Sequence, residues 1–428
     1  MFGRWKKREE RPVEWGGVEA GAMDTARKRW RSMYSSTQGM RLPAAIAGEL
    51  ARMTTVEMKV SVSGGERGKF LEKTLRPLTG RLSRELEYAL ADGNLVFKPY
   101  YDGKSLRIDI VRGDCFIPEA WDQGGIISQA VFVQEIKKED GYYTRLERHS
   151  LENGRYRIEN SAYKSRFPGE KGKKIPLGDV DEWSKMSESV VLENIDRPLF
   201  GFFRTPSANT VDPSSPLGVS VFSGAEELIA DADRLYKNLL WEFESGKRRL
   251  YVDVTAFDRD GKGRPKLPDT ELFRTIDVND SGFFSEWSPE LRNEAIQSGL
   301  NTVLQRIEFN CGLAYGTISQ PSYVEKTAEE IRASKQRSYC FVCDLQNQLK
   351  NALEELIYAL DVWTQVYGLA PAGDYGVGFE FDDSIAADRQ REYEEKIRLV
   401  ELGVMRPWEL RAWYFGEDEN AAKEAIGE

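Results

Sequence analysis

The longest helical pattern in the chain lies in its second half. From residue 327 to 367, apolar side chains recur every three or four residues and therefore share one face of a helix. Thr327 and Glu330 have the spacing of a capping box, so we expect the helix to begin there. At about 1.5 Å per residue the predicted helix is about 60 Å long. The apolar positions are Ile331, Phe341, Val342, Leu345, Leu349, Leu353, Leu356, Leu360, Trp363 and Tyr367.

Two further amphipathic segments flank a short insert. Residues 223–245 and 289–310 each predict a helix, the second capped by Ser288 with Pro289 in its first turn. Between them, LYVDVTAF and LFRTIDV read as strands on either side of the turn DRDGKGRPKLPD. Residues 314–326 contain a mixture of Gly, Ser, Thr, Gln and Pro that predicts a loop directly before the long helix.

The first half of the chain predicts mostly strands. Residues 85–165 contain alternating segments separated by turn residues, which favours a twisted antiparallel sheet. Within them, DGKS at 102–105 is typical of a hairpin turn. FGFFRTP predicts another strand, and residues 41–76 begin with a helical period and continue into the alternating EMKVSVSGG. The acidic segment 380–428 predicts two helices, the second beginning at Pro407. The predicted fold class is α+β.

Composition places this pattern in a globular protein. The 428 residues suffice for two or three domains, and 40% of them are hydrophobic and 11% aromatic. No apolar run reaches the ~20 residues needed to cross a bilayer. The N-terminal MFGRWKKREERPVEW is charged where a signal peptide would be apolar. We therefore expect synthesis in the cytoplasm and no contact with a membrane.

Few residues are candidates for catalysis or metal binding. His149 is the one histidine, and we expect it in a solvated loop, so catalysis by a Ser-His-Asp or Cys-His arrangement has little basis. Cys340 and Cys343 have a spacing found in zinc sites, but Cys115 and Cys311 are isolated. We interpret the pair as small apolar residues on a buried helical face.

Nucleotide and calcium motifs are incomplete. Gly103, Lys104 and Ser105 lack the earlier glycine of a phosphate loop, because Lys98 stands in its place. DRDGKGRPK lacks the later acidic ligands of an EF-hand. We expect no enzymatic activity, no catalytic residues, no cofactor and no metal site.

The order of these elements resembles the portal proteins of tailed bacteriophages, especially those of long-tailed phages of Gram-positive hosts. The resemblance covers roughly residues 40–428 and includes SVFSGAEELIADADRLY, the GTIS…EKTAEEI junction and FDDSIAADRQREYEEKIRLVELGVMRPWE. None of these stretches is a catalytic fingerprint, so the likeness depends on their order and spacing.

The resemblance implies a portal fold with a β-rich and helical wing, a two-helix stem, a small α/β clip, a long wing helix and a helical crown. It divides the chain into an N-terminal arm 1–40, wing 41–215, first stem helix 216–245, clip 246–288, second stem helix 289–313, tunnel loop 314–326, long wing helix 327–379 and acidic crown 380–428.

The implied function is a homo-oligomeric ring, usually of twelve subunits, at one vertex of the capsid. Double-stranded DNA is packaged through it by the terminase motor and later ejected. The resemblance also implies contacts with the head–tail connector, the major capsid protein and scaffolding proteins. The protein would be assembled in the host cytoplasm and located in the virion.

Two groups of site residues follow from this. In the tunnel loop, Gln320, Ser322, Tyr323 and Lys326 would contact DNA without reading its sequence. Lys326 is alternatively an ordinary exposed lysine beside a helix start.

In the clip, basic residues would dock an acidic surface of the motor or connector, because charge complementarity steers association. Residues 246–269 hold seven basic and four acidic side chains in an acidic protein. The alternative is a solvated turn without a partner. The proposed docking residues are Arg259, Lys262, Arg264 and Lys266.

Two other classes of function are considered. Another phage head protein, such as a connector or capsid subunit, is one, but a connector is usually shorter and a 60 Å helix does not suit a shell. A terminase-like DNA-processing enzyme is the other, and it requires a phosphate loop and a carboxylate cluster that the sequence lacks.

Overall fold

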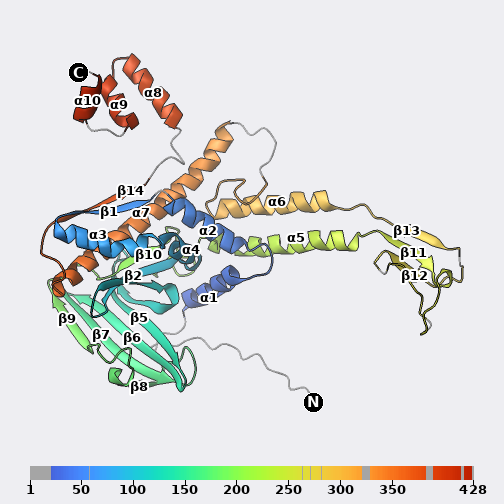
Figure 1. Ribbon diagram of the computed structural model, residues 1–428, viewed down its shortest axis with the longest axis horizontal. Coiled ribbons are helices and arrows are strands. Elements are labelled where there is room, and N and C mark those ends of the chain that lie inside the picture. The colour runs from blue at the N-terminus through green and yellow to red at the C-terminus, as the bar shows by residue number, and fades with distance from the viewer. Residues whose placement is uncertain are drawn as a thin grey trace.

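A long two-helix arm extends from a mixed body of helices and β-sheets (Figure 1). The computed structural model describes residues 21–56, 58–262, 264–269, 271–280, 282–320, 328–381, 389–415 and 419–426. The predicted α+β class is confirmed at this level, since separate antiparallel sheets and helices make up the body.

Helix α7 (Ala328–Val366) forms the spine of the body and confirms the predicted long helix. Thr327, the expected cap, lies outside the described residues. One face of α7 is fully buried and packs on β2, β3, β10, α2 and α3. The side chains on this face that are no more than 1% exposed are Leu345, Leu349, Ala352, Leu353, Leu356, Ile357 and Leu360.

A three-stranded antiparallel sheet lies directly against α7. Its order is β10 (Gly201–Arg204), β2 (Asn94–Tyr101), β3 (Leu106–Arg112). The predicted 102–105 turn joins β2 to β3, and the Asp102 carboxylate accepts the backbone N–H groups of Lys104 and Ser105 at 2.9 and 2.7 Å. The hairpin interpretation of DGKS is confirmed.

Four helices complete this part of the core. They are α1 (Ala22–Ser35), α2 (Leu42–Thr55), α3 (Glu66–Thr79) and α4 (Leu82–Asp92). The prediction of strands from residue 85 is wrong up to residue 92, because Leu82, Leu86 and Ala89 have helical spacing and are buried together. Strand structure begins only at β2.

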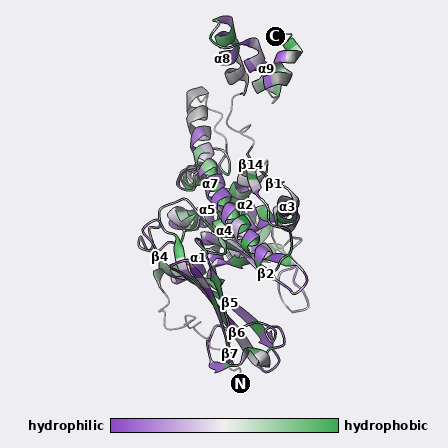
Figure 2. Cartoon of the chain, turned by 90° about the vertical axis from the view of Figure 1, so that its left-hand side faces the viewer, coloured by the Kyte–Doolittle hydropathy of each residue, from purple (hydrophilic) through white to green (hydrophobic). Residues whose placement is uncertain are grey.

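A larger antiparallel sheet extends from one side of the body, as Figure 2 shows. It confirms the predicted antiparallel sheet. Its path is β4-β5-β6-β7-β8, with β9 also paired to β7. The strands are β4 (Phe116–Trp121), β5 (Ile127–Lys138), β6 (Gly141–Glu152), β7 (Arg155–Ser165), β8 (Lys173–Ile175) and β9 (Ser189–Glu193).

A buried polar cluster connects the two sheets. Glu147 on β6 accepts a hydrogen bond from Lys98 on β2 at 2.6 Å and forms an ion pair with Arg145 at 2.9 Å. The ring of His149 lies 2.8 Å from Glu147 and 2.7 Å from the Tyr156 hydroxyl. His149 is only 3% exposed, so its predicted place in a solvated loop is wrong. Burial lowers the pKa of His149, because the charged imidazolium would lose its hydration.

A two-stranded sheet joins distant parts of the chain. Strand β1 (Lys59–Gly64) pairs antiparallel with β14 (Tyr375–Glu380). The sequence predicted the first strand but not the second, most of which falls in the range 327–379 assigned to the long wing helix. β14 has only six residues, and its partner lies more than 300 positions earlier.

The described residues of the C-terminal segment form three short helices, where two were predicted. They are α8 (Arg389–Glu401), α9 (Pro407–Phe415) and α10 (Glu419–Ile426), and they lie apart from the body (Figures 1 and 2). The predicted helix start at Pro407 is confirmed. Leu402 and Val404, between α8 and α9, are 74% and 73% exposed. Across the part of the chain that the structure describes, no helix combines the length and apolarity needed to span a membrane.

Gly201 allows β10 to approach α7 closely. A Cβ at this position would lie 2.0 Å from the carbonyl oxygen of Ala352. We expect Gly201→Ala to lower the free energy of unfolding by about 1–3 kcal/mol, because the backbones must separate. The matched control is Gly80→Ala, where an added Cβ meets no atom within 4 Å. Denaturant unfolding of both variants tests this, and equal midpoints would contradict it.

Candidate functional site: the two-helix arm

The arm consists of two adjacent antiparallel helices, α5 (Glu226–Ser245) and α6 (Asn293–Asn310) (Figure 1). Near the body, their facing side chains are buried and continue the main core. On α5 these include Ile229 and Ala232, and on α6 Leu304 and Ile307. The arm is therefore rooted in the same core as α7.

The predicted start of the second arm helix is wrong. Residues 288–292 are not helical, and α6 begins at Asn293, so Ser288 and Pro289 are not its cap and first turn. The reason is a tertiary contact: Glu242 on α5 accepts the backbone N–H of Arg292 at 3.0 Å. It also binds the Arg292 guanidinium at 3.1 and 2.8 Å.

The contact with Arg292 perturbs Glu242. The carboxylate belongs to a side chain that is only 8% exposed. Hydrogen bonds from the Arg292 side chain and backbone lower the pKa of Glu242 to about 2. The ion pair therefore fixes the end of the helix pair where the chain enters and leaves the insert.

The insert is a small sheet at the far end of the arm. Its order is β12 (Phe273–Ile276), β11 (Arg249–Asp253), β13 (Phe284–Trp287), with β12 parallel and β13 antiparallel to β11. The sequence predicted the first two strands and missed the third. The described residues of 246–288 contain a 3₁₀ turn at Val254–Ala256 but no α-helix, so the small α/β clip is corrected to a β clip.

Asp253 organises the loops of this sheet. It is fully buried and accepts the backbone N–H of Thr255 at 2.8 Å and its hydroxyl at 2.5 Å. Its second oxygen accepts the N–H groups of Val278 and Asp280 at 2.9 and 3.3 Å. These hydrogen bonds, those from Thr255 first, hold the pKa of Asp253 far below its usual range. The carboxylate thereby ties β11 to the loop before β13.

The structure brings the four predicted docking residues into one exposed turn. Asp260 accepts the backbone N–H groups of Lys262 and Arg264 at 2.8 and 2.9 Å. It also pairs with the Arg264 guanidinium at 3.0 Å, which offsets that charge. Arg259, Lys262 and Lys266 are exposed and make no ion pair with another described residue.

The clip also has an acidic half. Across residues 246–288 there are eight basic and eight acidic side chains, so the clip as a whole has no net charge. The net positive charge of residues 246–269 is cancelled by the acidic residues between 270 and 288. Glu286 on β13 pairs with Arg248 at 2.7 Å, while Asp277 and Asp280 lie in the loop beyond β12.

Large apolar side chains are exposed along the arm. On α5, Trp241, Leu240 and Phe243 are 63%, 51% and 42% exposed. In the clip, Phe284 and Trp287 are 60% and 50% exposed. Such a concentration on a slender projection is typical of a surface that another protein covers.

The first half of the predicted tunnel loop is held on the end of α6. The buried carboxylate of Glu308 accepts the N–H groups of Gly316, Ile318 and Ser319 at 3.1, 2.6 and 2.8 Å. The backbone N–H of Gln320 donates to Asn301 at 2.8 Å. Within 314–320 the one buried side chain is that of Ser319, at 6% exposed, so this part of the loop buries few side chains and is held through its backbone.

The candidate tunnel residues are only partly described. Gln320 is exposed at the end of the anchored segment. Ser322, Tyr323 and Lys326 lie outside the described residues. Sequence reasoning missed Glu308, although a glutamate on the apolar face of a predicted helix is the signal that could have found it.

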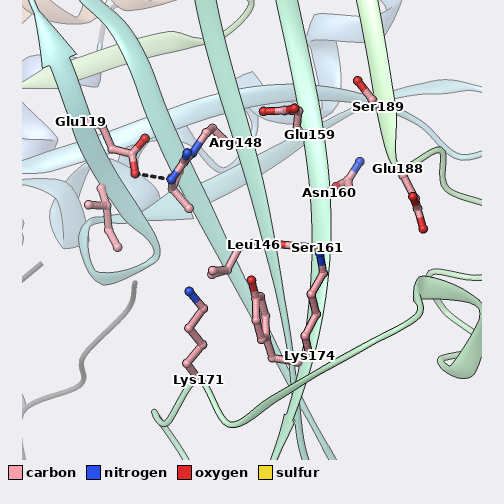
Figure 3. A pocket seen from close by; sticks show the side chains of 13 residues that line it. Glu119, Leu146, Arg148, Glu159, Asn160, Ser161, Lys171, Lys174, Glu188 and Ser189 are labelled. Atoms are coloured by element: carbon pink, nitrogen blue, oxygen red, sulfur yellow. Dashed lines mark hydrogen bonds and ion pairs between the residues drawn. The ribbon is translucent and has the colours of Figure 1, made fainter. Parts of the chain in front are cut away.

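A hollow of about 430 Å³ lies on the larger sheet (Figure 3). Arg148 donates to Glu119 at 2.8 Å on one side of it, and Lys171 and Lys174 stand at its edge. Three acidic and three basic side chains line the hollow, so it favours neither anions nor cations.

The cysteine interpretation is corrected in part. Cys340 is exposed and Cys343 half-buried, so the pair is not on a buried face. Within the described ranges, no group of three or more His, Cys, Asp or Glu side chains is arranged to hold a metal ion.

Comparison with known proteins gives no assignment. No family model matches the chain, and no curated protein matches it.

The Glu242–Arg292 pair gives the arm a defined pH response. The pKa of Glu242 is about 2 in the folded arm against an ordinary 4.5, so its stabilisation is complete above pH 4.5 and is lost as the pH falls through 2. We expect Glu242→Gln to speed amide exchange in 289–296 relative to wild type, by a ratio that shrinks as the pH falls below 4.5.

The control for this prediction is Glu244→Gln, because that side chain is 70% exposed. Exchange measured at matched pH values on both variants is the readout. A ratio for Glu242→Gln that is independent of pH would contradict the prediction.

Proposed function

We propose that the protein is a portal protein of a tailed bacteriophage. In this role it forms a ring at one capsid vertex, through which double-stranded DNA is packaged and later ejected. The observation that carries the proposal is the arm: two antiparallel helices project from the body and end in a small β clip. A loop and a 39-residue helix follow directly in the chain.

The exposed apolar residues of the arm support assembly into a ring. In a monomer, Trp241 and Leu240 on the arm and Trp287 in the clip would be exposed to water. Contact with these apolar side chains is unfavourable for water, and neighbouring copies that cover them would lower the free energy. Repeated head-to-tail contacts between identical copies close into a ring when the rotation between neighbours closes. The arms then form the stem of the ring and the clips form one end.

The charge of the chain suits a DNA conduit. DNA is held by phosphate contacts with Lys and Arg, and each such contact slows its passage. A formal net charge of −10 disfavours tight binding, so DNA can slide. Gln320, Ser322, Tyr323 and Lys326 would meet the DNA, and the Glu308 hydrogen bonds support this role because they give the loop a rigid mount.

Other partners follow from the same proposal. The clip would meet the terminase during packaging and the head–tail connector afterwards. The body would contact the major capsid and scaffolding proteins, and the mature location would be the virion. In the clip, Arg259, Lys262 and Lys266 are available for an acidic surface, whereas Arg264 already pairs with Asp260.

The first test of this function is assembly. We expect the purified full chain to form closed rings with an open axis, visible by negative-stain electron microscopy and with one dominant mass in native mass spectrometry. The physical reason is the apolar surface that a single copy leaves exposed. A protein that stays monomeric at micromolar concentration over a range of salt concentrations would overturn the proposal.

The second test concerns the clip charges. Changing Arg259, Lys262, Arg264 and Lys266 to Ser should leave rings intact and lower terminase-driven packaging by tenfold or more, because steering to an acidic partner is lost. Lys262→Ser alone should reduce packaging more than Arg264→Ser.

The matched control changes Lys69, Lys104 and Lys173 to Ser, three exposed lysines of the body. Packaging by the four-residue variant at the wild-type rate would rule out docking through the basic turn.

A further inference from the structure

One side of the arm has a groove between its two helices. The groove has a volume of about 580 Å³ and is lined by Trp241 and Asn238 from α5 and by Ala295, Ile296 and Gly299 from α6. The Arg292 guanidinium at its edge is paired with Glu242, so the groove has no unpaired charge of its own. Such a groove suits apolar side chains.

The opposite side of the same arm presents apolar side chains. Successive residues of a helix are about 100° apart around its axis. Measured from Asn238 around the α5 axis, Leu240 therefore lies at about 200° and Phe243 at about 140°. Both are exposed, at 51% and 42%. Neither lines the groove. The arm therefore has a hollow on one face and projecting apolar side chains on the other.

The two faces are level along the arm. Leu240 and Phe243 lie within about one and a half helical turns of Asn238 and Trp241, a separation of roughly 8 Å or less along the axis. If the two faces of adjacent copies meet, those copies are related by a rotation about an axis parallel to the arm, with little shift along it. A rotation without a shift closes into a ring, whereas a shift would give a helical filament.

We propose that the groove of each copy receives Leu240 and Phe243 of the adjacent copy. This inference rests on the proposed ring and names the surface that builds it. The occupant is a second copy, because the chain itself presents a matching apolar surface at the same height and on the opposite face. The contact is heterologous, so every copy uses its groove once and its projecting side once.

Cysteine pairing tests the contact directly. Ala295 lines the groove on α6 and Leu240 projects from the other side, so a disulfide between them can form only between copies. The full chain would carry Ala295→Cys and Leu240→Cys together with Cys340→Ser and Cys343→Ser. Mild oxidation of assembled rings should give a ladder of covalent multimers that ends at the ring size.

The controls separate this inference from the proposed function. Each single-cysteine variant should give no ladder. Rings in the microscope without a ladder would overturn the inference and leave the portal proposal intact. A product that stops at dimers would indicate a two-fold contact and would also overturn the inference. The absence of any ring would contradict the portal proposal itself.

A second variant tests how much the contact stabilises the assembled ring. Leu240→Ser should raise the concentration needed for half-assembly by at least tenfold, because it removes the side chain that fills the groove. Lys237→Ser, at an exposed position on the same helix, should leave assembly unchanged. Equal assembly by the two variants would contradict the proposed contact.

Discussion

The burial of one face of α7 against the β10-β2-β3 sheet is the interaction on which the rest of the molecule depends. Burying each leucine of that face contributes about 1.5–3 kcal/mol, and the face includes Leu345, Leu349, Leu353, Leu356 and Leu360. The core that these residues form continues without a break to Ile229 and Ile307 at the root of the arm. A projection this long needs such a base, because its own two helices bury little apolar surface farther out. The direction of the arm is thus fixed by the packing of its root against the body.

Beyond that base, buried carboxylates hold the chain where apolar packing is scarce. Glu242 fixes the entry to the clip, Asp253 its inner loop and Glu308 the segment after α6. Each accepts backbone N–H groups from residues that a short turn would otherwise leave without partners, and a buried charge is tolerated only with such hydrogen bonds. The three carboxylates hold three different loops, each by accepting hydrogen bonds from backbone N–H groups. Polar anchoring of this kind lets a slender arm keep a defined shape while its apolar side chains remain available to other molecules.

The sequence predicted those helices whose extent depends on residues close together in the chain. The existence of the long helix α7, its end near residue 367 and the start of α9 at Pro407 follow from periodicity and backbone geometry, and all three are found. The start of α6 was predicted wrongly because its determinant, Glu242, lies fifty residues away. His149 was placed in solvent because only the fold brings Tyr156 and Glu147 to its two nitrogens. The four candidate docking residues lie in an exposed turn, as predicted, but the pairing of Arg264 with Asp260 and the acidic residues in the second half of the clip were not foreseen.

The pairing of β1 with β14 has a consequence for synthesis of the chain on the ribosome. Residues 59–64 emerge early, yet their partner strand ends at residue 380, so β1 keeps an open edge during most of translation. An unpaired strand edge invites association with other chains. The body becomes complete only when nearly the whole polypeptide has been made, and a chain terminated early lacks both β14 and the three helices beyond it. Closure of this small sheet therefore distinguishes finished chains from fragments.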